Sequence, residues 1–283
     1  MKKILFLVFG VALLGLSSCF ELDNWAEPSS TWEGTVIDSY TNKPILSSQN
    51  DWQIRIWERS WKGQEKGATA AQDLRIKQDG TYKNTSLFDG TYDMILYNGP
   101  HWLVDTIKGL ELKKNLKYDI TVTPYVQVVD FKPELYQGEE IVSGKPTGKM
   151  LDSIKVTFRV RAPLLVNDKG LALPQLYEVR AFLSLTDFCG AGTDSSIGVS
   201  EYTQVLTINN NLNEAKGFVV RPAINANFTW AKLLEESSDN TTQVITLSSR
   251  VKSGYTYSVR VGAAVNDSYK KYCYSPILKV TVP

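Results

Sequence analysis

The chain has little of what most enzymes need: one histidine, His101, and three cysteines among 283 residues. Nucleophilic catalysis usually requires a base beside the nucleophile, and a lone histidine in a turn such as NGPHW is most often a solvated loop residue. Neither a Gly-x-Ser-x-Gly nor a His-Glu-x-x-His motif occurs, and CGAG at 189–192 lacks the lysine of a phosphate loop. No motif selects the two carboxylates of a glycosidase. We therefore expect no catalytic residue, no metal site and no cofactor.

The chain also lacks an excess of charge and a long apolar run. It has 31 basic and 30 acidic residues, a formal net charge of +1, which offers no electrostatic basis for nucleic-acid binding. Its longest apolar stretch, Ile4 to Leu16, falls short of the roughly 20 residues that span a bilayer. No later segment approaches that length, so we expect a protein on a membrane rather than in one.

The N-terminus has the organisation of a secretory signal peptide. Lys2 and Lys3 precede the apolar stretch, which ends in Leu16-Ser17-Ser18-Cys19. An apolar residue and two small ones before a cysteine resemble the bacterial lipobox, in which the thiol accepts a diacylglyceryl group. The alternative is an ordinary signal peptide with a chance cysteine. We expect residues 1–18 to be removed and a lipidated Cys19 to anchor the protein, followed by a polar tether up to residue 30.

From residue 31 the apolar residues follow period two, which is typical of strands with one buried face. In WQIRIWER (52–59) the residues Trp52, Ile54 and Ile56 alternate with polar positions, and Asp79-Gly80 is a hairpin signal. The pattern predicts a small β-sandwich over 31–124 and places Trp32 and Trp52 in its core.

The remaining residues, 125–283, show about seven strand patterns and one helix-like piece, WAKLLEES (230–237), with Trp230 expected in the core. A strand carrying Tyr255 and Tyr257 follows the turn at 252–254, which is typical of a tyrosine corner. The fold class is therefore all-β, with two sandwich domains in tandem.

Cys189 and Cys273 are the two cysteines left after Cys19. If the strand at 177–186 is the second of its sandwich, both cysteines lie at the same pole and a disulfide is feasible. If it is the third strand, they lie at opposite poles and remain thiols.

Sugar binding demands flat aromatic faces and polar groups that set orientation. Trp57 alternates with Ile54 and Ile56 and should be exposed on the outer face of its strand, although a neighbouring loop or the second domain could cover it. Residues of a following loop and a nearby turn could share the same edge. The candidate glycan-binding residues are thus Trp57, Trp61, Trp102, Arg55, Arg59 and His101.

Two segments resemble the transthyretin-like, carboxypeptidase-regulatory type of β-sandwich: GTVID at 34–38, and DGTY at 79–82 with FDGTY at 88–92. The second domain is similar to fibronectin-type or immunoglobulin-like modules. Together with the lipobox, this order resembles the DUF3823 type of Bacteroidetes lipoprotein.

That resemblance implies a location and a function. Glu21 and Asp23 loosely match an export signal that places such lipoproteins on the outer membrane, facing the cell exterior. Related lipoproteins are often associated with glycan uptake through TonB-dependent transporters. We therefore expect a non-enzymatic lipoprotein that binds or presents a polysaccharide or oligosaccharide. The alternative is a structural or adhesion module that contacts partner proteins at the cell surface.

Overall fold

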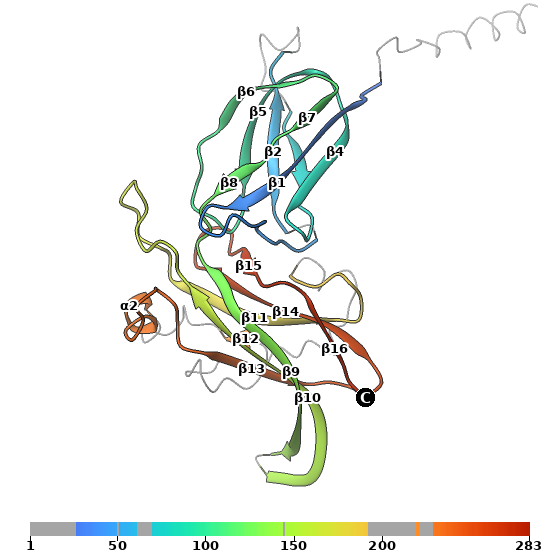
Figure 1. Ribbon diagram of the computed structural model, residues 1–283, viewed down its shortest axis with the longest axis vertical. Coiled ribbons are helices and arrows are strands. Elements are labelled where there is room, and N and C mark those ends of the chain that lie inside the picture. The colour runs from blue at the N-terminus through green and yellow to red at the C-terminus, as the bar shows by residue number, and fades with distance from the viewer. Residues whose placement is uncertain (1–26, 50, 61–69, 144, 192–218, 221–228) are drawn as a thin grey trace, which may run out of the picture.

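A computed structural model describes residues 27–49, 51–60, 70–143, 145–191, 219–220 and 229–283. It is almost entirely β-structure, arranged in two bodies that follow one another along the longest axis (Figure 1). The prediction of an all-β fold built from sandwiches is confirmed. No helix in the described ranges is long and apolar enough to cross a bilayer. The predicted signal peptide, Cys19 and most of the tether lie outside the described residues.

The first domain consists of two sheets. One has the order β4-β1-β7 with β8 also paired to β1, and the other has the order β3-β2-β5-β6. The strands are β1 (Ser30–Asp38), β2 (Gln53–Glu58), β3 (Gln72–Arg75), β4 (Thr81–Leu87), β5 (Gly90–Tyr97), β6 (Ile107–Leu112), β7 (Asn115–Lys117) and β8 (Ile120–Val122).

Alternation explains how these sheets enclose a core. Every second residue of β1 is buried, beginning at Ser30, so Trp32 and Val36 point inward. From the opposite sheet, Ile54 and Ile56 of β2 are fully buried against them. Burying an aliphatic side chain of this size contributes roughly 1.5–3 kcal/mol, so the apolar face holds the register of each strand.

The second domain also has two sheets, ordered β13-β10-β9 and β12-β11-β14-β15, with β16 paired to β14. Its elements are β9 (Gln127–Val142), β10 (Lys145–Arg161), β11 (Leu176–Ser184), β12 (Val219–Val220), α2 (Trp230–Leu233), β13 (Ile245–Arg250), β14 (Thr256–Val265), β15 (Tyr272–Tyr274) and β16 (Leu278–Thr281).

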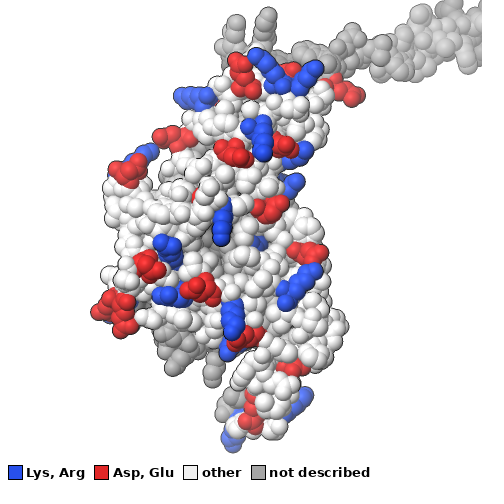
Figure 2. Space-filling view, viewed as in Figure 1, with Lys and Arg blue, Asp and Glu red and all other residues white. Residues whose placement is uncertain are grey.

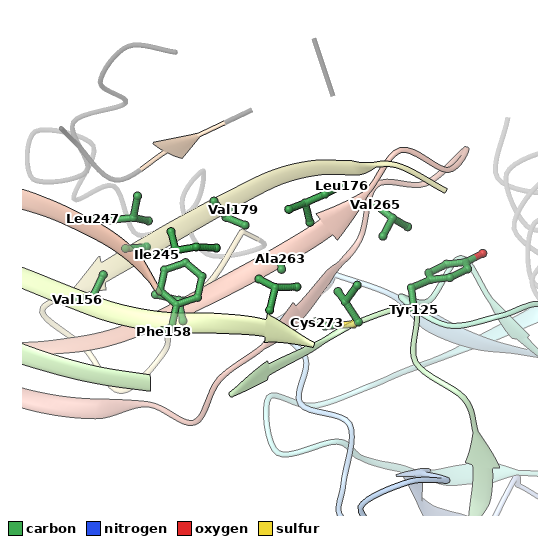
Figure 3. Packing of buried hydrophobic residues seen from close by; sticks show 14 of the residues in the cluster. Tyr125, Val156, Phe158, Leu176, Val179, Ile245, Leu247, Ala263, Val265 and Cys273 are labelled. Atoms are coloured by element: carbon green, nitrogen blue, oxygen red, sulfur yellow. The ribbon is translucent and has the colours of Figure 1, made fainter. Parts of the chain in front are cut away.

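The core of the second domain lies between these sheets, where side chains from β10, β11, β13 and β14 point toward one another (Figure 3). Tyr125 and Cys273 lie at the end of this core beside the first domain (Figure 3). Strand β14 is buried on both faces, because a second cluster containing Phe182 and Ala264 covers its other side. A strand covered on both faces belongs to the centre of a structure rather than to its surface.

One long hairpin departs from the expected pattern. Strands β9 and β10 are antiparallel: Gln127 pairs with Arg161 at one end, and Val142 pairs with Lys145 at the other. Their distal part projects beyond the second domain (Figure 1). Residues 145–150 are all exposed, as are Leu135 and Tyr136. Because neither face of this distal part is buried, it lacks the alternation that identifies a strand from sequence.

Two local predictions have clear outcomes. Tyr257 is fully buried, its hydroxyl accepts from Lys252 N at 3.1 Å and donates to Lys252 O at 3.4 Å, and it therefore forms the tyrosine corner.

Cys189 and Cys273 form no disulfide. They belong to different apolar clusters, on opposite sides of the sheet that contains β14. Burial raises the pKa of Cys273 to about 12, so this thiol stays protonated.

Candidate functional site

The outer face of β2 and the residue that follows this strand carry three of the predicted residues. Arg55, Trp57 and Arg59 alternate with buried Ile54 and Ile56, as predicted. Trp57 is half-buried, so the expectation of a fully exposed ring is only partly met. It pairs with Asp93 of β5, near the C-terminal end of β2. Trp61 lies outside the described residues.

Ion pairs hold the two arginines in fixed positions on this face. Arg55 Nε and Nη2 donate to the two carboxylate oxygens of Asp73 at 2.8 and 3.0 Å, and the guanidinium lies 4.1 Å from the ring centre of Tyr97. The hydrogen bonds from Arg55 lower the pKa of Asp73, against the opposing effect of burial. Arg59 Nε donates to Asp93 at 2.9 Å. The arginines thus position charge and aromatic rings rather than present an unpaired cation.

The aromatic part of this face continues into the second domain. Tyr97 meets Tyr269 edge-to-face, with ring centres 5.7 Å apart, and Tyr269 is 40% exposed. We call Trp57, Tyr97 and Tyr269, with Arg55 and Arg59, the aromatic strip. It combines flat apolar rings with oriented N–H donors, which is the chemistry that recognises a sugar ring.

His101 and Trp102 do not join this strip, because both are buried: 3% and 8% of their surfaces are exposed. The turn that carries them faces the second domain. His101 packs edge-on against Trp52 with ring centres 5.9 Å apart, and its Nδ1 donates to Trp102 O at 2.8 Å. Trp102 packs against Tyr125 within the second core. The expectation of an exposed turn is wrong, since the surface that covers it comes from the other domain.

Asp51 is the centre of a buried polar network between the domains. It is 7% exposed and sits in the loop before β2. Lys271 Nζ lies 3.0 Å from its Oδ1, and the Tyr274 hydroxyl donates to its Oδ2 at 3.0 Å. Burial, followed by the nearby Asp51 charge, raises the pKa of Tyr274 well above its ordinary value. Each partner satisfies a group that would be costly to bury alone.

Arg260 adds a second connection between the domains. Arg260 is 1% exposed. Its Nη1 donates to Ser47 O at 2.7 Å and to Cys189 O at 3.0 Å, and its Nη2 donates to Ser275 O at 3.0 Å. It also lies 4.1 Å from the ring centre of Tyr274. Carbonyl oxygens solvate this cation in place of a carboxylate, because it forms no ion pair with any described residue.

Gln78 bridges the same boundary with both ends of its amide. Its Nε2 donates to Asp187 O at 2.8 Å and its Oε1 accepts from Cys189 N at 2.9 Å. These bonds join the turn before β4 to the segment that follows β11. The two domains are therefore fixed to one another by buried side chains as well as by the covalent connection at 123–126.

A cavity of about 580 Å³ opens beside these connections. We call it the junction cavity, and its lining residues are Leu46, Gln49, Arg75, Ile76, Lys77, Gln78, Asp79, Phe188, Arg260, Pro276 and Ile277. Elsewhere, basic and acidic side chains are interspersed over the face shown in Figure 2. The described ranges contain no group of three metal-ligating side chains.

The sequence did not identify the junction cavity. Alternation places Arg260 opposite the core-facing Val259 and Val261, which is the ordinary position of a surface charge. Only the docking of the first domain turns that surface into an interior. Asp79-Gly80 was identified as a hairpin signal, yet nothing local shows that the same turn lines a cavity.

Comparison with known proteins places this arrangement among related folds. Residues 30–123 match the family described as "Protein of unknown function (DUF3823) N-terminal domain". A solved DUF3823 family protein from Bacteroides uniformis is 17% identical with a TM-score of 0.59, and one from Parabacteroides merdae is 16% identical with a TM-score of 0.54. Each match covers 90% of this chain and 100% of the other.

A further solved protein from Bacteroides uniformis, described as a "putative carbohydrate binding protein", is 19% identical with a TM-score of 0.58 and the same coverage. At these identities the likeness concerns the fold. No curated protein sequence matches the chain. The family match spans the first domain and the structural matches span both, which confirms the resemblance identified from the sequence: residues 30–123 are similar to the DUF3823 N-terminal domain, and the chain has the fold of the solved DUF3823 proteins.

Proposed function

We propose that this protein is a non-enzymatic lipoprotein of the outer membrane that binds glycan on the cell surface, as an accessory of an uptake system with a TonB-dependent transporter. The aromatic strip carries this proposal. Trp57 and Tyr97 lie on one outward face, and the adjacent arginine donors are held by Asp73 and Asp93. A sugar ring can stack beside the guanidinium groups, which lie 4.1 Å from the ring centre of Tyr97 and 5.8 Å from that of Trp57, while its hydroxyl groups meet fixed charges.

Two further observations support the proposal. A solved protein with the same fold is described as a "putative carbohydrate binding protein". His101, the one histidine, is buried and its Nδ1 is committed to a backbone carbonyl, which removes the most common general base from any exposed site.

The test uses residues 20–283 in affinity gels that contain a broad panel of neutral polysaccharides. We expect at least one polysaccharide to retard the protein, and Trp57→Ala to abolish that retardation through loss of the stacking surface. Tyr136→Ala is the matched control, because Tyr136 is an aromatic residue 50% exposed on the projecting hairpin. The proposal fails if no polysaccharide retards the wild-type protein, or if both variants behave alike.

Membrane anchoring is tested separately in cells. Cys19→Ala should abolish incorporation of labelled fatty acid and release the protein from the membrane fraction, because the thiol is the acceptor of the lipid. Protease added to intact cells should degrade the wild-type protein if it faces the exterior. Protection of the protein in intact cells would contradict surface exposure without affecting the lipidation result.

One observation favours a second function, a module that contacts a partner protein. The projecting β9–β10 hairpin exposes Leu135, Tyr136 and Met150, at 39%, 50% and 56%. Apolar side chains on a two-stranded projection have no role in the core of their own domain. Isolation of a stable complex from native membranes that is lost on Tyr136→Ser and Met150→Ser, without any glycan affinity, would favour this function.

A further inference from the structure

The junction cavity has the dimensions of a ligand site. Its volume of about 580 Å³ lies within the range of small-molecule pockets, roughly 300–1,000 Å³. It is lined by two segments of the first domain, at 46–49 and 75–79, and by Phe188, Arg260, Pro276 and Ile277 of the second domain. Its lining shares no residue with the aromatic strip.

The charged groups of this cavity are predominantly basic. Arg75, Lys77 and Arg260 face a single acid, Asp79. That carboxylate is already occupied, since its Oδ1 accepts from Thr81 N at 3.0 Å and Thr81 Oγ1 at 2.7 Å. Arg75 and Lys77 are exposed and form no ion pair with any described residue. Two unpaired cations beside a buried third create a positive potential that favours an anion.

Apart from Gln49 and Gln78, the rest of the lining is apolar and includes one exposed aromatic ring. Phe188 is 45% exposed, and its neighbours in the cavity are aliphatic: Leu46, Ile76, Pro276 and Ile277. A small inorganic anion has no apolar surface to bury against these side chains. The combination suits an anionic group carried on a ring with an apolar face, which an acidic sugar provides.

The walls are held in position before any ligand arrives. Gln78 and Arg260 both line the cavity, and both bond across the domain boundary. A preformed site avoids much of the entropy that a mobile site loses on binding.

We propose that the junction cavity binds an acidic saccharide, with its carboxylate or sulfate group at Arg75 and Lys77 and its ring against Phe188. This inference rests on the proposed glycan-binding function and assigns that function a second site with its own ligand class.

Isothermal titration calorimetry at low ionic strength tests the proposal with four defined probes. These are tetragalacturonate, its fully methyl-esterified form, a κ-carrageenan tetrasaccharide that carries sulfate without carboxylate, and an acetylated Asp-Glu tetrapeptide. We expect tetragalacturonate or the sulfated probe to bind and the methyl ester to bind at least about tenfold more weakly, since charge-assisted hydrogen bonds are lost. The tighter of the two acidic saccharides identifies the anionic group.

Variants locate the site. Arg75→Gln with Lys77→Gln should weaken binding of the acidic saccharide at least about tenfold, and Phe188→Ala should weaken it without removing charge. The control, Lys108→Gln with Lys117→Gln, removes equal charge from exposed positions of the same domain outside the cavity and should change affinity less than about twofold.

Equal binding of the acid and its methyl ester, equal loss in both double variants, or equally tight binding of the tetrapeptide would overturn the proposal. Trp57→Ala separates it from the function of the aromatic strip. If that variant keeps the acidic ligand but no neutral glycan binds the wild type, the strip fails and the junction cavity stands. If neutral glycan binds through Trp57 and neither acidic saccharide binds, only the junction cavity fails.

Discussion

Burial of the single histidine predicts a specific dependence of stability on pH. His101 is 3% exposed, and burial lowers the pKa of its imidazole, although the hydrogen bond to Trp102 O and the nearby Asp267 oppose this shift. Its Nε2 is buried without a hydrogen-bond partner among the described residues. Protonation would therefore place a charge on a nitrogen that nothing solvates.

The sign follows from comparing the folded and unfolded states. The unfolded chain protonates His101 near its ordinary pKa of about 6.5, and the folded protein does so only at lower pH. As the pH falls below about 6.5, the unfolded state binds the proton first, so the free energy of unfolding decreases. The loss approaches about 1.4 kcal/mol per pH unit and ends at the folded pKa. Above about pH 7.5, His101 contributes no slope.

Urea unfolding between pH 5 and pH 8 measures this slope. His101→Gln keeps a polar group that can donate to Trp102 O and removes the titration, so its stability should vary less between pH 6.5 and pH 5. Carboxylates titrate mainly below this window, at about 4. The single imidazole also gives one histidine resonance by NMR, so its pKa can be measured without a variant. An imidazole pKa at or above 6.5, or equal slopes for both proteins, would refute the reasoning.

Three substitutions test packing in urea unfolding. Gly99→Ala places a methyl group 2.4 Å from the His101 ring, so we expect a loss of about 1–3 kcal/mol, and an unchanged midpoint would show that the turn relaxes freely. Tyr257→Phe removes the bonds to Lys252 and should cost about 1–2 kcal/mol; no loss would mean that the tyrosine corner does not stabilise the domain. Ile54→Ala empties part of the first core and should cost about 2–5 kcal/mol, with a smaller loss indicating local collapse.

Alternation in the sequence identified the residues whose neighbours lie within the same domain. Ile54 and Ile56 are buried while Arg55 and Trp57 face outward, because one face of β2 covers a core made by its own sandwich. Trp32 is buried for the same reason. In these strands the residues that the alternation predicts to be buried are the ones that the sandwich buries.

The pattern failed where that environment comes from elsewhere or is missing. Trp102 lies in a turn that reads as exposed, yet it packs into the core of the second domain. The distal β9–β10 hairpin shows the opposite case. Residues 145–150 are all exposed and so show no buried stripe, although Lys145, Pro146 and Met150 are paired with β9. A period-two pattern indicates that one face of a strand is buried, not that the strand is hydrogen-bonded. It therefore cannot predict a strand that is paired but exposed on both faces.

The junction between the domains determines how the two candidate surfaces can work. A hinge there would have to separate Asp51 from Lys271 and Tyr274 and remove Arg260 from the carbonyl oxygen of Ser47. Opening the junction would also withdraw Trp102, which is 8% exposed, from the core of the second domain and return a buried aromatic side chain to water, which is unfavourable. The junction cavity therefore keeps its shape in the absence of ligand, and the aromatic strip, which ends at Tyr269 of the second domain, keeps its direction relative to that cavity. A glycan chain that met both surfaces would therefore be held in one fixed orientation relative to the two domains.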